Sequence, residues 1–486
     1  MGIVINQSFK NTINTYLGFG IGGINVLFLY TNFVSDTYYG VIAFILSSAN
    51  IMMPLMAFGV HNTIIKFYST YKTKNTLNSF LTLMLFLPLL IAIPVGCIGY
   101  FFYDIIGGWL ASKNEIVKDY VWHIFISGLV MAYFEVFFAW SKAQMQTVFG
   151  NFMKEVFHRV GIMILLFMVY FKIITVDTLI DGVVLVYILR MLIMKLYAFS
   201  VRKPVLKFTK INNFNAVIKY SSLIIIAGSI ATLILDIDKV MLGKLMPNIE
   251  KVAYYSVAVF IGAVIAVPQR AMQQILMPLT AKLLNDNDKQ GLKKLYERSS
   301  LTLFTISGFM FLLIVLNINE LYFIIPSEFS NGIYVVFLIS AAKLYDNLLG
   351  NNNAILFNSD YYRMVLFFGV ILTILTMLLN LVFIPKYGIN GAGIATFMAI
   401  AVYNSIKIYF VKLKFNMLPF SKQSLKIVGL IICCIVAFYF WEFPFYPIIN
   451  IALKSTLIGL VYVFAIYKMN VSDDISNIIK RYLKLK

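Results

Sequence analysis

Long apolar segments recur along the whole chain and are separated by short polar stretches. Each segment has about 20 residues, the length a helix needs to cross the hydrocarbon core of a bilayer. Because lipid cannot satisfy an exposed backbone, such segments predict transmembrane helices. The predicted spans cover residues 12–33, 39–60, 79–103, 120–141, 157–175, 178–199, 216–238, 252–277, 299–325, 332–350, 364–384, 388–411, 424–441 and 446–467. The pattern therefore predicts an all-α polytopic membrane protein with about fourteen helices.

Composition agrees with this prediction and excludes several classes of protein. Of the 486 residues, 60% are hydrophobic and 13% are charged, and the mean hydropathy is +0.85. Soluble proteins are about half apolar and about a quarter charged. A soluble enzyme, a disordered chain and a secreted disulfide scaffold are therefore excluded. The cysteines lie in apolar segments and the three histidines are scattered, so no metal site is expected. We also expect no cofactor.

The net charge of +19 has two compatible explanations. In a soluble protein it would suggest nucleic-acid binding, but in this chain we attribute it to the positive-inside bias and expect no nucleic-acid partner. Alternate loops carry 29 and 8 basic residues, with Lys407 counted in a loop on the richer side. This alternation predicts that both termini are cytoplasmic. A cationic path for an anionic substrate is the second explanation.

An internal repeat predicts the domain organisation. The segment 37–45 aligns with 253–261 at an offset of 216 residues, and both contain a Tyr-Tyr pair. Six predicted helices separate the copies, so both halves enter the membrane in the same direction. We expect two six-helix lobes around a central cleft, at 1–199 and 216–415. The connector 200–215 joins them, and 416–486 adds two helices and a basic tail.

Ionisable side chains inside the predicted spans are the candidate functional residues, because each costs about 2.5–3.5 kcal/mol at a helix centre. The candidates for a substrate cleft are Arg270, Lys142, Glu135, Lys239, Asp238 and Asn25. In the functional interpretation, Arg270 and Lys142 bind an anionic headgroup, and Glu135 is a counter-charge or a proton-coupled carboxylate. In the structural interpretation, Glu135 pairs with a neighbouring basic group and the other charges reach the interface.

Two further features have a structural and a functional interpretation. The first span is rich in Gly and Asn, including Gly18, Gly22 and Asn25, which predicts close helix packing or amides that bind sugar. Lys343 and Asp346 are three residues apart on one helical face, which favours an ion pair on the helix surface.

Three segments resemble a known family. The segment 379–396 (LNLVFIPKYGINGAGIAT) resembles a turn of the polysaccharide flippases, the O-antigen and capsule exporters of the MATE-like (multidrug/oligosaccharidyl-lipid/polysaccharide) superfamily. The segments 38–40 with 58–60, and 238–239 with 253–258, are similar to that family's second helix and seventh-to-eighth junction. The resemblance covers about residues 10–415. In the turn, Pro385 is expected to stop a helix, and Gly388 and Gly391 to supply the turn conformations.

The resemblance implies a transporter rather than an enzyme. Its substrate would be a polyprenyl-diphosphate-linked oligosaccharide for O-antigen (lipopolysaccharide), capsule or exopolysaccharide, moved by alternating access across the bacterial inner membrane. Membrane lipids and a polysaccharide polymerase are the implied partners. Two alternatives are a cation-coupled multidrug exporter of the same superfamily and a membrane glycan polymerase or ligase. Such a polymerase usually needs a sizeable outer catalytic loop, which the short predicted loops do not provide.

Overall fold

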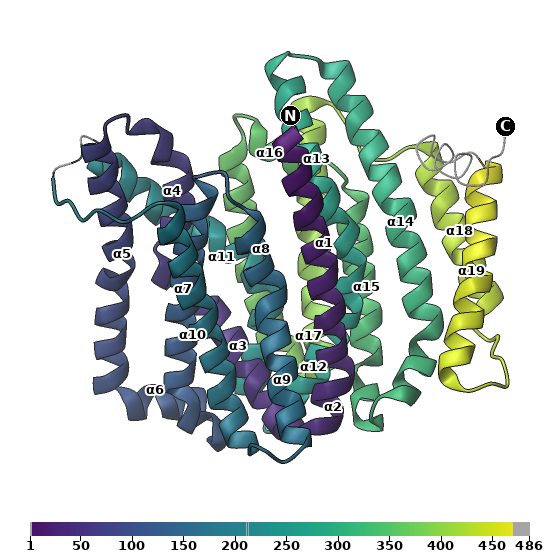
Figure 1. Ribbon diagram of the computed structural model, residues 1–486. Coiled ribbons are helices and arrows are strands. Elements are labelled where there is room, and N and C mark those ends of the chain that lie inside the picture. Colours follow the sequence, from purple (N-terminus) through teal and green to yellow (C-terminus); the bar gives the residue numbers. More distant parts are fainter. Residues whose placement is uncertain (1, 210, 212, 470–486) are drawn as a thin grey trace. The chain divides into compact units, whose positions relative to one another are not determined.

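The computed structural model describes residues 2–209, 211 and 213–469, and these contain helices but no β-strand (Figure 1). The chain divides into two compact units, Met1–Ser256 and Val257–Lys486. Eight of the described helices are long and apolar enough to cross a membrane, or nine if one bent pair is a single span. The predicted all-α polytopic class is therefore confirmed, whereas the count of fourteen spans stays a prediction.

The first unit is a bundle of long helices connected by short turns. Its helices are α1 (Gly2–Ile24), η1 (Asn25–Leu29), α2 (Tyr30–Phe33), α3 (Asp36–Ala57), α4 (Val60–Phe67), η2 (Tyr68–Thr70), α5 (Lys74–Phe101), α6 (Tyr103–Leu110), η3 (Glu115–Tyr120), α7 (Val121–Lys142), α8 (Val148–Phe152), η4 (Met153–Phe157), α9 (His158–Tyr170), α10 (Val176–Val201) and α11 (Phe214–Leu245). Helix α12 (Glu250–Ala263) crosses the boundary between the units.

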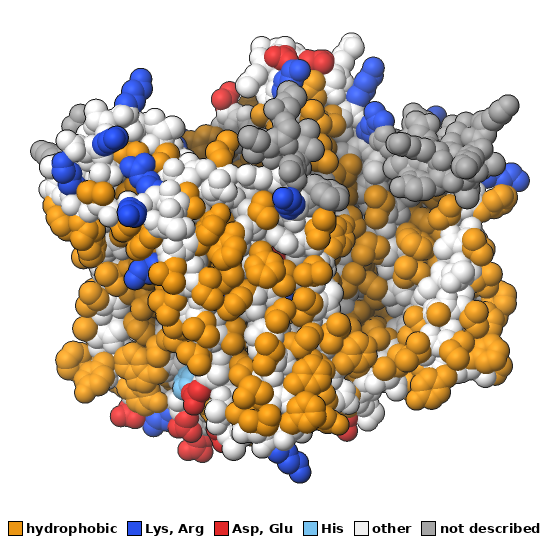
Figure 2. Space-filling view, in the orientation of Figure 1, with side chains coloured by type: hydrophobic (Ala, Val, Ile, Leu, Met, Phe, Trp, Pro, Cys, Tyr) orange, Lys and Arg blue, Asp and Glu red, His pale blue; other side chains and the backbone are white. Residues whose placement is uncertain are grey.

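Large aromatic side chains form the core of the first unit. Phe80, Phe134, Phe138 and Trp140 are all buried there, on α5 and α7. On the outside of these helices, apolar side chains form a broad belt between an end with Lys and Arg and an end that carries both acidic and basic side chains (Figure 2). An apolar belt between two charged ends is what a bilayer requires of the lipid-facing surface.

The two copies of the internal repeat meet inside the first unit. Tyr254 at the start of α12 donates a 2.8 Å hydrogen bond to Asp36 at the start of α3, and Thr37 donates to Glu250 at 2.8 Å. Gly40 makes the contact possible, because a Cβ there would lie 2.3 Å from the Ile249 carbonyl oxygen. The repeat thus marks a helix–helix contact. The expected lobes 1–199 and 216–415 stay a prediction.

The second unit contains longer and more broken helices. These are η5 (Val264–Ala266), α13 (Val267–Asn285), α14 (Lys289–Ile324), η6 (Ser327–Gly332), α15 (Ile333–Leu348), α16 (Asn352–Asn358), α17 (Tyr362–Phe415), α18 (Lys422–Phe438) and α19 (Pro447–Met469). The last two helices pack on α14 through a buried cluster that includes Leu312, Ile431 and Tyr462. Both helices lie within residues 416–486, and their role as an addition to two lobes stays a prediction.

Two glycines break long helices in this unit. Gly388 has φ 57° and ψ −132° within α17, so the predicted turn lies here, three residues after Pro385. A Cβ on Gly391 would lie 2.1 Å from the Phe383 carbonyl oxygen, so the two arms of α17 come into close contact. Gly350, with φ 53°, lies where α15 and α16 meet at a bend of 55°. Broken helices of this kind occur in transporters where the chain lines a polar site.

Candidate substrate-binding site

Glu135 forms an ion pair with Lys154 inside the first unit. Glu135 lies on α7, and its carboxylate is 2.6 Å from the Lys154 ammonium on η4. The Glu135 side chain is 13% exposed and that of Lys154 is 43% exposed, so the pair reaches solvent from the lysine side. The structure therefore brings Glu135 to a neighbouring basic group, as the structural interpretation expected.

Lys142 and His61 lie close enough to this pair to act on the Glu135 carboxylate electrostatically. Lys142 ends α7 two turns beyond Glu135, on the same helical face. Its ammonium lies 3.8 Å from the centroid of the Phe138 ring, a cation–π contact. The two predicted site residues Glu135 and Lys142 thus belong to one group of charges.

A second ion pair joins Glu155 on η4 to Arg159 on α9, one turn beyond Lys154. The Arg159 guanidinium is 3.3 Å from the Glu155 carboxylate and donates a 2.8 Å bond to the Glu155 backbone carbonyl. Both groups pack against the glycine-rich helix α1. A Cβ on Gly18 would lie 2.3 Å from the Glu155 carbonyl oxygen, and one on Gly22 would lie 3.1 Å from Arg159 Nε. At these positions the glycines serve close packing.

Asn25 fixes α1 to this region and is 3% exposed. Its amide nitrogen donates a 2.8 Å hydrogen bond to the Arg159 backbone carbonyl, whereas its buried carbonyl oxygen has no hydrogen-bond partner. Asn25 begins the π-helical segment η1, and Arg159 follows the π-helical segment η4. Such π segments are frequent at functional sites, because they displace side chains from the regular helical positions.

Arg190 is a buried cation that our sequence analysis did not include among the candidates. It lies on α10 and is 7% exposed, with its guanidinium 4.2 Å from the Phe134 ring centroid and 4.7 Å from that of Tyr187. Glu135, Glu155 and Arg159 act on it electrostatically. Its position inside a predicted span was the signal that could have identified it.

These side chains define the N-terminal charged cluster, which consists of Glu135, Lys142, Lys154, Glu155, Arg159 and Arg190. It contains four permanent cations and two carboxylates, a net excess of positive charge inside a helical bundle. Ionisable groups that lie between membrane helices generally face a partner or a water-filled cavity.

Arg270 lies in the second unit, near the start of α13, and is exposed. It is close enough to Lys343 on α15 for the two charges to interact. Its role in a cleft stays a prediction.

Lys407 corrects our count of the basic loops. It is 1% exposed and lies within α17 rather than in a loop. Its ammonium donates a 3.1 Å hydrogen bond to Asn353, lies 3.9 Å from the Asp346 carboxylate and stacks 4.2 Å from the Tyr403 ring centroid. Asp346 therefore contacts Lys407 of another helix. Our prediction of an ion pair between Asp346 and Lys343 on the helix surface did not include this contact. The predicted span 388–411 already contained Lys407, so the error lay in counting this lysine among the loop residues and not in the hydropathy.

Asp238 and Lys239, at the far end of α11, have structural contacts in the first unit. Asp238 is fully buried and accepts a hydrogen bond from the Tyr255 hydroxyl. Lys239 lies 3.4 Å from Asp236, which also accepts a 2.8 Å bond from Ser47. These contacts join α11 to α3 and α12. The proposed roles of both residues in a cleft stay predictions.

Long apolar helices and charged groups buried between them define a polytopic helical membrane protein with polar sites inside its bundles. The chain belongs to the polysaccharide biosynthesis protein family, whose model matches residues 8–284. This confirms the predicted family. A search of curated proteins finds no match.

Solved structures share the fold. The lipid II flippase MurJ in an inward closed conformation is 14% identical, with a TM-score of 0.72 over 95% of this chain and 99% of that one. An inward-facing multidrug resistance MATE family transporter of the MOP superfamily is 12% identical, with a TM-score of 0.59 over 86% and 95% of the two chains. MATE in complex with MaL6 is 10% identical, with a TM-score of 0.56 over 84% and 96%.

Proposed function

We propose that the protein is a flippase that moves polyprenyl-diphosphate-linked oligosaccharide units across the bacterial inner membrane by alternating access. The product would serve the synthesis of O-antigen, capsule or exopolysaccharide at the cell surface. Family membership supports a role in polysaccharide biosynthesis. The fold shared with a protein named lipid II flippase supports a lipid-linked substrate.

The N-terminal charged cluster is the observation that carries the proposal. A diphosphate linkage brings negative charge into the membrane, and this charge needs cations in a region of low dielectric. Lys142, Lys154 and Arg159 provide charge beyond what Glu135 and Glu155 neutralise. In this proposal the cluster binds the diphosphate while the lipid tail remains in the bilayer.

The second unit offers a further group of cations. Lys343 and Lys407 surround the single carboxylate of Asp346, and Arg270 is within electrostatic reach of Lys343. An excess of cations in each unit fits an anionic substrate better than the cationic drugs of multidrug exporters. We therefore place the multidrug exporter second.

A leaflet assay separates the flippase from the glycan polymerase. In cells that lack the protein, a flippase predicts that lipid-linked repeat units accumulate on the cytoplasmic leaflet. A polymerase predicts single units displayed at the surface, and that result would overturn the proposal.

A matched pair of variants tests the cluster itself. Lys142→Gln removes a cation of the cluster, whereas Lys195→Gln removes an exposed lysine near the end of α10, 5.9 Å from the Phe199 ring centroid and outside the cluster. We expect Lys142→Gln to reduce surface polysaccharide at equal protein level and Lys195→Gln to leave it unchanged. Equal effects would remove the cluster from the transport path.

A further inference from the structure

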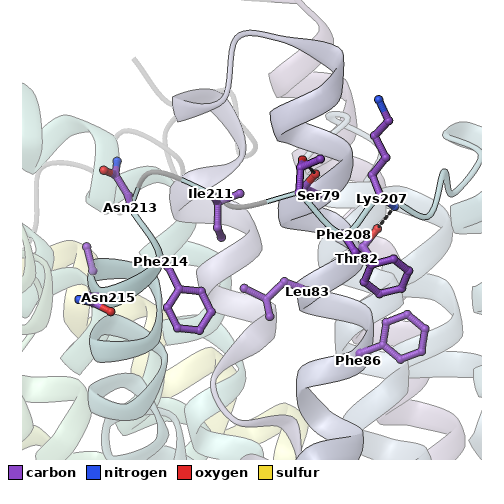
Figure 3. A pocket seen from close by; sticks show the side chains of 12 residues that line it. Ser79, Thr82, Leu83, Phe86, Lys207, Phe208, Ile211, Asn213, Phe214 and Asn215 are labelled. Carbon is purple, nitrogen blue, oxygen red and sulfur yellow. Dashed lines mark hydrogen bonds between the residues drawn. The ribbon is translucent and has the colours of Figure 1, made fainter.

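A cavity of about 900 Å³ lies at the basic end of the first unit, between α5 and the start of α11. Described residues of the connector after α10, which are Lys207, Phe208, Thr209, Ile211 and Asn213, form its roof. Ser79, Lys207 and Asn213 lie toward one side of this cavity, and the rings of Phe86 and Phe214 lie further in (Figure 3). The cavity thus has a polar rim and an apolar interior.

Hydroxyl groups of α5 fix the connector in place. Thr82 accepts a 3.0 Å hydrogen bond from the Lys207 backbone nitrogen, and Ser79 bonds to Thr209. Ser79 and Thr82 are three residues apart and therefore on one face of α5. Because the roof is held by side chains of a membrane helix, the cavity is a built feature of the unit.

The connector exposes two large apolar side chains on either side of a lysine. Leu206 is 56% exposed and Phe208 is 80% exposed, with Lys207 between them. Exposed apolar side chains next to a lysine are typical of the headgroup zone, where the ring enters the lipid and the ammonium faces water. A connector surrounded by water would hold these apolar groups at a cost.

The charge around the cavity has one sign. Among the described residues that line the cavity, Lys207 is the one charged side chain and none is acidic. The Lys207 ammonium donates a 2.6 Å hydrogen bond to Asn75, which leaves further donors on the same group. A cavity with a cationic rim and an apolar interior is complementary to an anionic amphiphile.

We propose that this cavity is a binding site for the headgroup of an anionic phospholipid, whose acyl chains follow Phe86 and Phe208. Basic pockets beside membrane helices bind anionic headgroups in this way. The lipid would hold the connector against α5.

Lipid titration of the purified full-length protein, with bound lipid counted by native mass spectrometry, tests the site. The probes are phosphatidylglycerol and phosphatidylcholine. We expect the first lipid bound to be phosphatidylglycerol. One surface cation contributes about a five-fold change in affinity. Lys207→Gln should therefore weaken the binding of phosphatidylglycerol by about this factor and leave the binding of phosphatidylcholine unchanged.

Two further variants make the result specific. Lys203→Gln removes an exposed cation that lies on the same connector but does not line the cavity. This variant should bind phosphatidylglycerol as the wild type does. Ala216→Phe places a ring in the cavity without removing a charge and should abolish the first site. Circular dichroism melts confirm that each variant is folded.

Three results would overturn the proposal: no preference for phosphatidylglycerol, equal loss in Lys207→Gln and Lys203→Gln, or an intact first site in Ala216→Phe. Displacement of phosphatidylglycerol by millimolar inorganic phosphate would assign the site to a soluble anion instead, and would also overturn it. Because the assay measures no transport, its failure leaves the proposed function untouched.

Discussion

The ion pair between Glu135 and Lys154 predicts an asymmetry in stability. Lys154→Gln removes the ammonium that lies 2.6 Å from a carboxylate with only 13% of its side chain exposed. Glu135→Gln instead leaves an ammonium whose side chain is 43% exposed and reaches solvent. The first variant leaves a buried unpaired charge, and the second does not.

The expected magnitudes follow from this difference in exposure. Removing one partner of a fully buried pair costs about 3–5 kcal/mol. In Lys154→Gln the charge of Lys142 remains near Glu135, and water can enter from the side where Lys154 was exposed. We therefore expect this variant to lower the free energy of unfolding by about 2 kcal/mol. For Glu135→Gln we expect about 0–1 kcal/mol, as for exposed pairs. The double variant removes both charges and should resemble Glu135→Gln, so the coupling energy should equal the cost of Lys154→Gln, about 2 kcal/mol.

Unfolding by sodium dodecyl sulfate in mixed micelles, followed by circular dichroism, measures these differences. The four proteins of the cycle are compared in one detergent at one ionic strength. Equal destabilisation by the two single variants, or strict additivity in the double variant, would refute the reasoning.

The same variants decide the role of Glu135 in transport. If Glu135 is a counter-charge, Glu135→Gln keeps surface polysaccharide at near wild-type levels. If the carboxylate carries a proton during transport, the same variant loses surface polysaccharide although its stability is unchanged.

Four further predictions use other parts of the chain. Gly18→Val should reduce the amount of folded protein in membranes, measured by immunoblot, because its Cβ would lie 2.3 Å from a backbone carbonyl oxygen. Gly20→Val is the control, since a Cβ there meets open space. Lys407→Met should destabilise the protein by about 2 kcal/mol in detergent unfolding, because it removes the ammonium next to Asp346 while Lys343 remains within electrostatic reach, and Asp346→Asn should restore part of this loss. Arg270→Ala should lower surface polysaccharide at constant protein level, and unchanged polysaccharide would end its proposed role. A reporter fused after the last residue should be active only in the cytoplasm; activity outside would contradict the predicted topology.

Local composition was enough to determine the class of protein. Runs of about 20 apolar residues specify membrane helices wherever they occur, because the cost of an unsatisfied backbone in lipid does not depend on the rest of the fold. The Pro385 and Gly388 turn also followed from the sequence, since it depends on the backbone limits of those two residues. Glycine in the first span likewise indicated close packing.

Tertiary structure alone decided which charges meet. Glu135 and Lys154 are on different helices, and Lys407 reaches Asp346 from a helix 61 positions further along the chain. Such pairs depend on the depth and rotation of each helix, which are set by packing against its neighbours. The cavity under the connector has the same origin, because it exists only when Ser79 and Thr82 hold a distant segment. Hydropathy is a property of each residue and can be taken from the sequence. A polar site depends on contacts between segments that are distant in the sequence, and only the folded chain brings these together.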